Sequence, residues 1–171
     1  MIVGSDGRAK VYRPLSEAAR TAAREAGVRA YEEGHFFEAH ELLEPAWMGS
    51  PDPAERDLDQ GLIKLAAAYV HARRGNALGM RKNLVGARRR LAAVVNEHGE
   101  AGTRAAARAR VDARVLVRLV EEALARLEAL AGQEALAGQE AGLVVLVPPP
   151  HVPRIAAAEP GGRAGRSARA G

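Results

Sequence analysis

The sequence has no cysteine and few aromatic residues, and both absences narrow what the chain can be. Without cysteine there is no disulfide framework, no thiolate zinc site and no cysteine nucleophile. Aromatic residues make up only 4% of the chain, and β-branched residues are scarce outside one short run near the end, so the residues that favour strands are largely missing. Alanine and arginine dominate instead, and both favour helix. We therefore expect an all-α fold.

The sequence also lacks a long apolar run and a secretory leader. Its longest apolar stretch is interrupted by Lys64 and ends at His71, which is too short and too polar to cross a bilayer. Residues 1–14 contain no apolar h-region. There is no phosphate-binding loop, no dinucleotide fingerprint and no serine elbow. We expect a cytoplasmic protein that makes no membrane contact and has no nucleophilic catalyst.

The formal net charge of +4 is unevenly distributed along the chain. Four arginines and one glutamate lie after Pro148 and account for three of the four excess charges. Residues 32–59 hold nine acidic groups against Arg56, whereas residues 70–118 hold twelve basic groups against three acidic ones. Neighbouring helices with complementary exposed faces explain this polarity most simply, and a basic surface for an anionic partner is the alternative.

Capping residues and helix breakers predict about five helices in a single compact bundle. The predicted helices are residues 16–31, 35–48, 53–74, 76–97 and 112–130. Residues 100–110 have almost no apolar stripe, so we interpret them as a loop or a marginal helix. We expect a flexible N-terminus over residues 1–14, a helical bundle domain over 15–147 and a disordered Pro/Gly/Arg-rich tail over 148–171.

The third predicted helix is apolar around most of its circumference, which predicts that it is central in the bundle. One side carries Leu58, Leu62, Leu65 and Tyr69, and the adjoining face carries Ile63, Ala66 and Val70. The remaining stripe is polar in part and consists of Gln60, Lys64, Ala67 and His71.

The second predicted helix places polar groups beside aromatic ones. His40 lies on the same face as Phe36 and Trp47, and Glu44 follows one turn later, so the imidazole and the carboxylate can meet. Burying both groups is costly unless they are paired. His40 and Glu44 therefore need a partner, which is either another side chain or a ligand.

The same residues carry a family resemblance. Residues 34–44, followed by Trp47, resemble the opening signature of domain-of-unknown-function family 309, and residues 60–66 and 73–76 continue the match. The resemblance covers roughly residues 30–95. It implies a compact helical bundle without an established function. Its motif positions in this chain are His40, Glu44, Trp47, Gln60, His71 and Asn76.

Three functional hypotheses are consistent with these residues. The favoured one is a non-enzymatic binding or assembly module, in which His40, Glu44 and His71 form a buried hydrogen-bond network and the partner is a protein or a second copy of the chain. The second is a metal-dependent enzyme of the hydrolase or oxygenase type. Here His40, Glu44 and His71 would bind a divalent metal, and Glu41 would be the catalytic base.

The third hypothesis is a groove for a peptide, a nucleotide or RNA, with Trp47, Tyr31 and arginines as contacts. The basic clusters Arg81–Lys82 and Arg88–Arg90 on the fourth predicted helix would bind an anionic ligand or RNA. No aromatic residue interleaves with these clusters, which disfavours nucleic acid.

Overall fold

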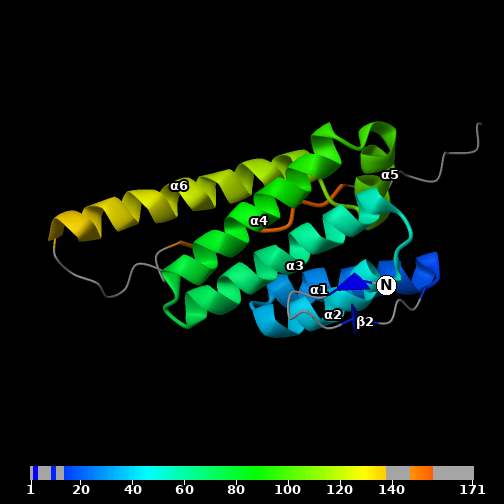
Figure 1. Ribbon diagram of the computed structural model, residues 1–171, viewed down its shortest axis with the longest axis horizontal. Coiled ribbons are helices and arrows are strands. Elements are labelled where there is room, and N and C mark those ends of the chain that lie inside the picture. Colours follow the sequence, from blue (N-terminus) through cyan, green and yellow to red (C-terminus); the bar gives the residue numbers. More distant parts are fainter. Residues whose placement is uncertain (1, 4–8, 11–13, 138–146, 156–171) are drawn as a thin grey trace, which may run out of the picture.

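The computed structural model describes residues 2–3, 9–10, 14–137 and 147–155, and within them the fold is all-α, as predicted (Figure 1). Six helices follow one another: α1 (Glu17–Glu32), α2 (Phe36–Gly49), α3 (Pro53–Arg73), α4 (Ala77–Asn96), α5 (Gly99–Ala109) and α6 (Ala113–Ala137). Two short strands, β1 (Ile2–Val3) and β2 (Ala9–Lys10), pair antiparallel before the first helix.

The capping residues read from the sequence begin the helices. The Ser16 hydroxyl accepts a hydrogen bond from the Ala19 amide, and Asp52 accepts one from Ala54 just before α3. Asn76 and Asp112 cap α4 and α6 in the same way. These side chains satisfy amides that the first helical turn leaves without intrahelical partners, which explains why the boundaries were predictable.

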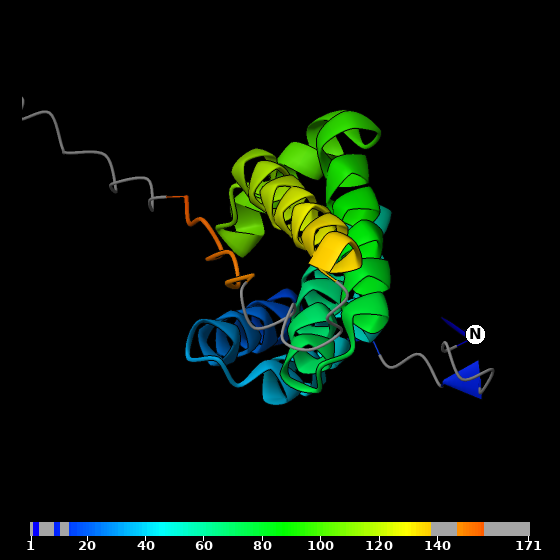
Figure 2. The same ribbon diagram turned by 90° about the vertical axis from the view of Figure 1, so that its left-hand side faces the viewer.

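Helix α3 lies in the centre of the bundle, as predicted. Helices α2 and α4 flank it, α1 packs on α2, and α6 packs on α4, so the helices form an arc around α3 (Figure 2). The two predicted apolar faces of α3 are buried apart from half-buried Val70, and the stripe from Gln60 to His71 is half-buried. None of the helices in the described part of the chain combines the length and apolarity that a membrane span needs.

Helix α5 forms where the sequence indicated a loop or a marginal helix. Its buried residues are Gly102, Ala105 and Ala109, all of them small. A Cβ atom added to Gly102 would lie 1.9 Å from the carbonyl oxygen of Val94 in α4. Because the two backbones approach so closely, α5 packs through small residues, and a search for a stripe of large apolar side chains does not detect it.

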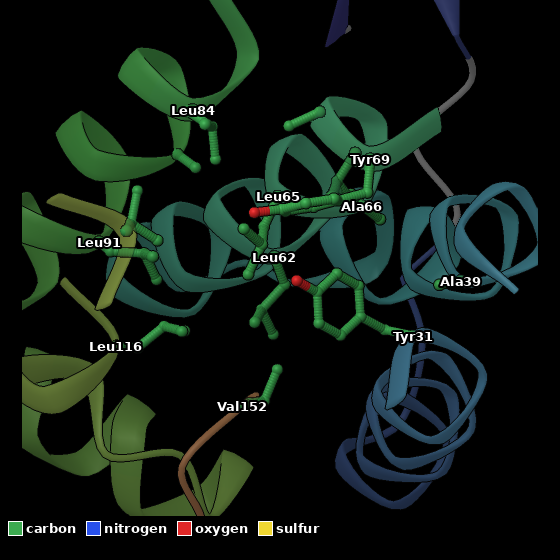
Figure 3. Close-up of a cluster of buried hydrophobic side chains, with 14 of the residues drawn as sticks. Tyr31, Ala39, Leu62, Leu65, Ala66, Tyr69, Leu84, Leu91, Leu116 and Val152 are labelled. Carbon is green, nitrogen blue, oxygen red and sulfur yellow. The ribbon is translucent and has the colours of Figure 1, made fainter. Parts of the chain in front are cut away.

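Residues 147–155, which we call the strap, cross the open side of the arc between α1 and α6 (Figure 2). Val147 and Val152 are buried, and Figure 3 shows Val152 facing the core near Leu62 and Leu116. The prediction of a disordered tail from Pro148 onward is therefore wrong for residues 148–155. Proline-rich composition disfavours helices, but an extended proline segment still offers carbonyl groups and apolar side chains to a groove.

Other parts of the predicted tail and termini lie outside the described residues. These are residues 156–171, residues 138–146 and most of the N-terminal segment 1–14. The short run of β-branched residues near the end of the chain, residues 143–147, therefore falls almost wholly outside them.

Candidate functional site

The structure does not bring the three predicted metal ligands together as a ligand set. His40 is one-third exposed, and its Nδ1 lies 3.1 Å from Oε1 of Glu41 on the solvent side of α2. His71 lies at the far end of α3, and Glu44 is half-buried on α2. Among the residues that the structure describes, no three His, Cys, Asp or Glu side chains gather in a way that could hold a metal ion. The printed hydrogen bond of the His40 imidazole is to exposed Glu41, and the buried network around His40 stays a prediction.

Two of the family motif positions instead shape the turn between α3 and α4. Asn76 Nδ2 donates to Nδ1 of His71 at 3.1 Å, while Asn76 Oδ1 accepts from the Gly79 amide at 2.7 Å. Gly75 has a φ of +67°, and a Cβ atom on Gly79 would lie 2.5 Å from the His71 ring. The Gly-Asn-x-x-Gly spacing is therefore explained by a left-handed turn residue, a helix cap and close packing against an imidazole.

Trp47 and Gln60 are also explained by packing. Trp47 is partly buried and packs against the hydrophobic core, and Gln60 is half-buried on the polar stripe of α3. Neither lines the cavities described below. Trp47 thus contributes to core packing, and its role as a recognition residue stays a prediction.

Replacing Asn76 with alanine is expected to lower the free energy of unfolding by about 1 kcal/mol, because α4 loses its N-cap. Urea denaturation measures this change. Asn96→Ala, at the exposed C-terminal end of the same helix, is the matched control and should stay within about 0.5 kcal/mol of the wild type. Equal losses in the two variants would contradict a capping role.

The most deeply buried polar groups form an ion cluster that the sequence analysis missed. The guanidinium of Arg24 on α1 bonds to both oxygens of Asp59 and, at 2.7 Å, to Oε2 of Glu55 on α3. Arg20 and Ser50 donate to the same glutamate oxygen at 2.9 and 3.0 Å. Glu55 and Asp59 have no exposed surface, and Arg24 is 2% exposed. We call these five residues the buried ion cluster.

Every carboxylate oxygen of the cluster accepts at least one hydrogen bond from a side chain. Arg108 of α5 donates to the remaining oxygen of Glu55 at 3.1 Å, and both oxygens of Asp59 are bonded to Arg24. Both carboxylates are also shut off from solvent, with no exposed surface. The cluster therefore joins α1, α3 and α5 and has a structural role.

Burial and pairing move the pKa values of the two carboxyl groups in opposite directions. Burial alone would raise the pKa of Glu55, but hydrogen bonds from Arg24 and Arg20 outweigh it and hold the pKa at about 2. Burial raises the pKa of Asp59 to about 6, because the opposing hydrogen bond from Arg24 does not fully offset it. The two pKa values therefore lie on opposite sides of the ordinary carboxyl range, one below it and one above it.

These shifts predict a stability maximum near pH 4 for the contribution of the cluster. Asp59 is easier to protonate in the folded chain, so stability falls as the pH rises from about 4 to 6. Glu55 is harder to protonate in the folded chain, so stability also falls as the pH drops from about 4.5 towards 2. Urea denaturation across this range, for the wild type and Asp59→Asn, measures both slopes. Parallel profiles for the two proteins between pH 4 and 6 would contradict the assignment to Asp59.

A second feature, an aromatic cluster, forms where α1, α2 and α3 meet. The ring centroid of Phe36 lies 5.3 Å from that of Tyr31 and 5.4 Å from that of Tyr69. The guanidinium of Arg73 lies 5.0 Å from the Phe36 centroid, within the range of a cation–π contact. Figure 3 shows two of its members, Tyr31 and Tyr69, in the same part of the core as Val152 of the strap.

Side chains of α1 and α3 bind the backbone of the strap. Tyr31 donates its hydroxyl hydrogen to the carbonyl of Pro150 and Tyr69 donates to that of Pro148, both at 3.0 Å. The Glu32 carboxylate accepts the amide of Val152. Burial raises the pKa of both tyrosines well above the ordinary value, so their hydroxyls stay protonated and remain donors.

The far end of the strap pairs with the chain before α6. The Asp112 amide donates to the carbonyl of Pro153 at 2.9 Å, and the Ile155 amide donates to that of Arg110 at 3.0 Å. We call the surface formed by Tyr31, Glu32, Tyr69 and residues 110–112 the strap groove. These hydrogen bonds all engage main-chain groups of the strap.

Cavities lie at both ends of the strap. One of about 340 Å³ is bounded by Phe36, Tyr69, Arg73 and strap residues 147–149. Another of about 200 Å³ is bounded by Ile155 and by residues of α4, α5 and α6. A third of about 430 Å³ lies beyond Phe36, beside Phe37, whose side chain is 63% exposed. A cavity is therefore present at each end of the strap, one beside residues 147–149 and one beside Ile155.

Comparison with protein families confirms the resemblance noted in the sequence. Residues 25–83 match the model of a family described as "Domain of unknown function (DUF309)". Tyr31, Glu32 and Tyr69 lie in the matched segment, whereas the strap lies outside it. No curated protein and no solved structure matches the chain.

Proposed function

Because the family whose model matches residues 25–83 is named for its unknown function, we propose a function from the strap groove. The protein is a non-enzymatic binding module that holds an extended, proline-containing peptide of a protein partner. The strap occupies the same groove in cis. The observation that carries this proposal is that Tyr31, Glu32 and Tyr69 all bond to the backbone of the strap.

Such contacts suit an extended peptide from any source, because every peptide has the same backbone groups. Proline has no amide hydrogen, so a groove that offers hydroxyl donors to carbonyls suits a proline-containing segment. Aromatic-lined grooves recognise preformed extended proline helices for this reason. The buried side chains of Val147 and Val152 supply the apolar contacts that select among sequences.

The metal-dependent alternative has less support from the geometry. His40 bonds to an exposed glutamate, and His71 bonds to the cap of α4. Glu41, the candidate base, lies on the solvent side of α2 and is 55% exposed. A cytoplasmic location stays a prediction from the sequence.

The test displaces the strap from the groove by a substitution and then adds the strap sequence as a separate peptide. Val152→Asp places a charge in an apolar site and should displace the strap, whereas His151→Asp adds the same charge at an exposed position of the strap. The probe is a fluorescent synthetic peptide with the sequence of residues 147–155, and fluorescence anisotropy measures its binding. A second peptide carrying aspartate at the position of Val152 is the specificity control.

The peptide should bind Val152→Asp at least about tenfold more tightly than the wild type, whose tethered strap competes at a high effective concentration. His151→Asp should behave as the wild type. Adding Tyr31→Phe and Tyr69→Phe to Val152→Asp should weaken peptide binding by about 1 kcal/mol for each lost hydrogen bond. If Val152→Asp unfolds, the peptide should restore its helical circular dichroism. The proposal would be refuted if the peptide neither bound Val152→Asp nor restored its helical circular dichroism. Equal binding of the control peptide would also refute it.

A further inference from the structure

Helix α4 presents a regular basic face that no other described element covers. At 100° per residue, Leu78 and Val85 lie on one line along the exposed side of α4. Arg81 and Arg88 follow one flank of that line, and Lys82 and Arg89 follow the other; each of these pairs is spaced by seven residues. Leu78 is 63% and Val85 37% exposed. We call these six residues the basic face.

The basic face has almost no compensating negative charge. Within the described part of the chain, Arg81 reaches the exposed Glu128 of α6 at 3.2 Å, and the other three cations of the face form no ion pair. An exposed pair of this kind contributes little to stability and is easily exchanged. The face therefore keeps its positive charge available to a partner.

A further cation from α3 increases this positive charge. The aliphatic part of Lys64 packs against Gly86, where an added Cβ would lie 2.7 Å from Lys64 Cδ. Burial lowers the pKa of Lys64, and the neighbouring Arg90 and Arg89 lower it further. Arg90 is paired with Asp57 at 2.6 Å, whereas in the described part of the chain neither Lys64 nor Arg89 forms an ion pair with an acidic side chain. An anionic partner would relieve the repulsion among these cations.

The spacing of the face indicates the shape of that partner. An apolar line with a seven-residue repeat, flanked by charges with the same repeat, is the pattern by which one helix recognises another. The basic face extends from Leu78 to Arg89 and is about 18 Å long at the 1.5 Å rise per residue of an α-helix. We propose that the basic face docks an acidic amphipathic helix of a protein partner, with apolar residues against Leu78 and Val85 and carboxylates along both flanks.

Other occupants fit these observations less well. A second copy docking through the same face would place cations against cations. Nucleic acid would place phosphates on both flanks but leave Leu78 and Val85 between them without an apolar contact. A membrane surface would gain little from two apolar side chains enclosed by cations.

This inference is independent of the proposed function. The basic face is on α4, whereas the strap crosses between α1 and α6, and Figure 2 shows the two on different sides of the bundle. A partner helix on α4 and a peptide in the strap groove would not compete for the same residues.

The test uses the full chain and a designed helical peptide of about three heptads, with leucine on the central line and glutamate on both flanks. A peptide of identical composition with its heptad order scrambled controls for charge. The protein variants are Arg88→Glu with Arg89→Glu, and a control with Arg118→Glu and Arg126→Glu on exposed positions of α6, which changes the net charge equally. Isothermal titration calorimetry at low and high salt measures binding.

The heptad peptide should bind the wild type at least about tenfold more tightly than the scrambled peptide, because the apolar line contributes as well as charge. Reversal of Arg88 and Arg89 should abolish binding, the control on α6 should change it less than about threefold, and high salt should weaken it. Equal binding of the two peptides, or equal losses in the two variants, would overturn the proposal. Tighter binding of duplex RNA or of anionic vesicles at the same salt would also overturn it.

Discussion

Replacing Arg24 with methionine is expected to lower the free energy of unfolding by about 3–5 kcal/mol, the largest effect of any single substitution proposed here. The change removes the hydrogen bonds of the guanidinium to Asp59 and Glu55, both of which have no exposed surface. Asp59 then loses its hydrogen bonds to Arg24, whereas Glu55 keeps those from Arg20, Ser50 and Arg108. The cost of burying the Asp59 carboxyl group is therefore no longer offset. Urea denaturation monitored by circular dichroism measures the loss.

Two further variants test this explanation. Arg29→Met lies on the exposed side of the same helix and should change the free energy of unfolding by less than about 0.5 kcal/mol. Combining Arg24→Met with Asp59→Leu should recover part of the loss, because the carboxyl group left without a partner is removed as well. If Arg24→Met costs no more than Arg29→Met, the buried ion cluster does not stabilise the bundle.

Replacing Gly102 with alanine is expected to destabilise the chain by about 1–3 kcal/mol through overpacking. The added Cβ would lie 1.9 Å from the carbonyl oxygen of Val94, which is backbone and cannot turn away as a side chain does. Helix α5 must therefore move away from α4. That shift also strains the bond between Arg108 and Glu55 in the buried ion cluster.

The matched control is Gly132→Ala in α6, where nothing lies within 4 Å of the added Cβ. It should stabilise the chain by about 0.5–1 kcal/mol, since alanine favours helix more than glycine does. The two variants make the same chemical change in helices, so their opposite signs isolate the effect of packing. A neutral or stabilising Gly102→Ala would show that the contact between α4 and α5 is looser than the structure indicates.

Local signals made most of the bundle predictable from the sequence. Four of the five predicted helix starts depend on a side chain that accepts a hydrogen bond from an amide two or three residues later, as Ser16 and Asn76 do. The exception is α2, whose first residues follow His35 without a side-chain cap. The central position of α3 follows from apolar residues on nearly all of its sides. The family match over residues 25–83 was likewise carried by short motifs, and the structure explains some of these by turns and caps.

The candidate sites were less predictable, because their residues are far apart in the sequence. The buried ion cluster has a visible trace in the matched spacing of Arg20 with Arg24 and of Glu55 with Asp59, but arginines on α1 carry no sign that they face inward. The sequence instead drew attention to His40 and Glu44, whose helical spacing allows contact without requiring burial. The strap groove needs Tyr31 and Pro150 together, 119 residues apart.

By itself, the sequence determined the fold class, the family resemblance over residues 25–83, most of the helix caps and the central place of α3. These depend on interactions within a few residues or on the periodicity of one helix. The tertiary structure alone decided that residues 99–109 are helical, that residues 147–155 close the bundle, and that Arg24 is buried while His40 is not. Each of these depends on free energy gained between segments that are distant in the chain. Close backbone packing at Gly102 stabilises α5, and tyrosine hydroxyls that donate to proline carbonyls hold the strap. The carboxylates of α3 offset the cost of burying the Arg24 guanidinium.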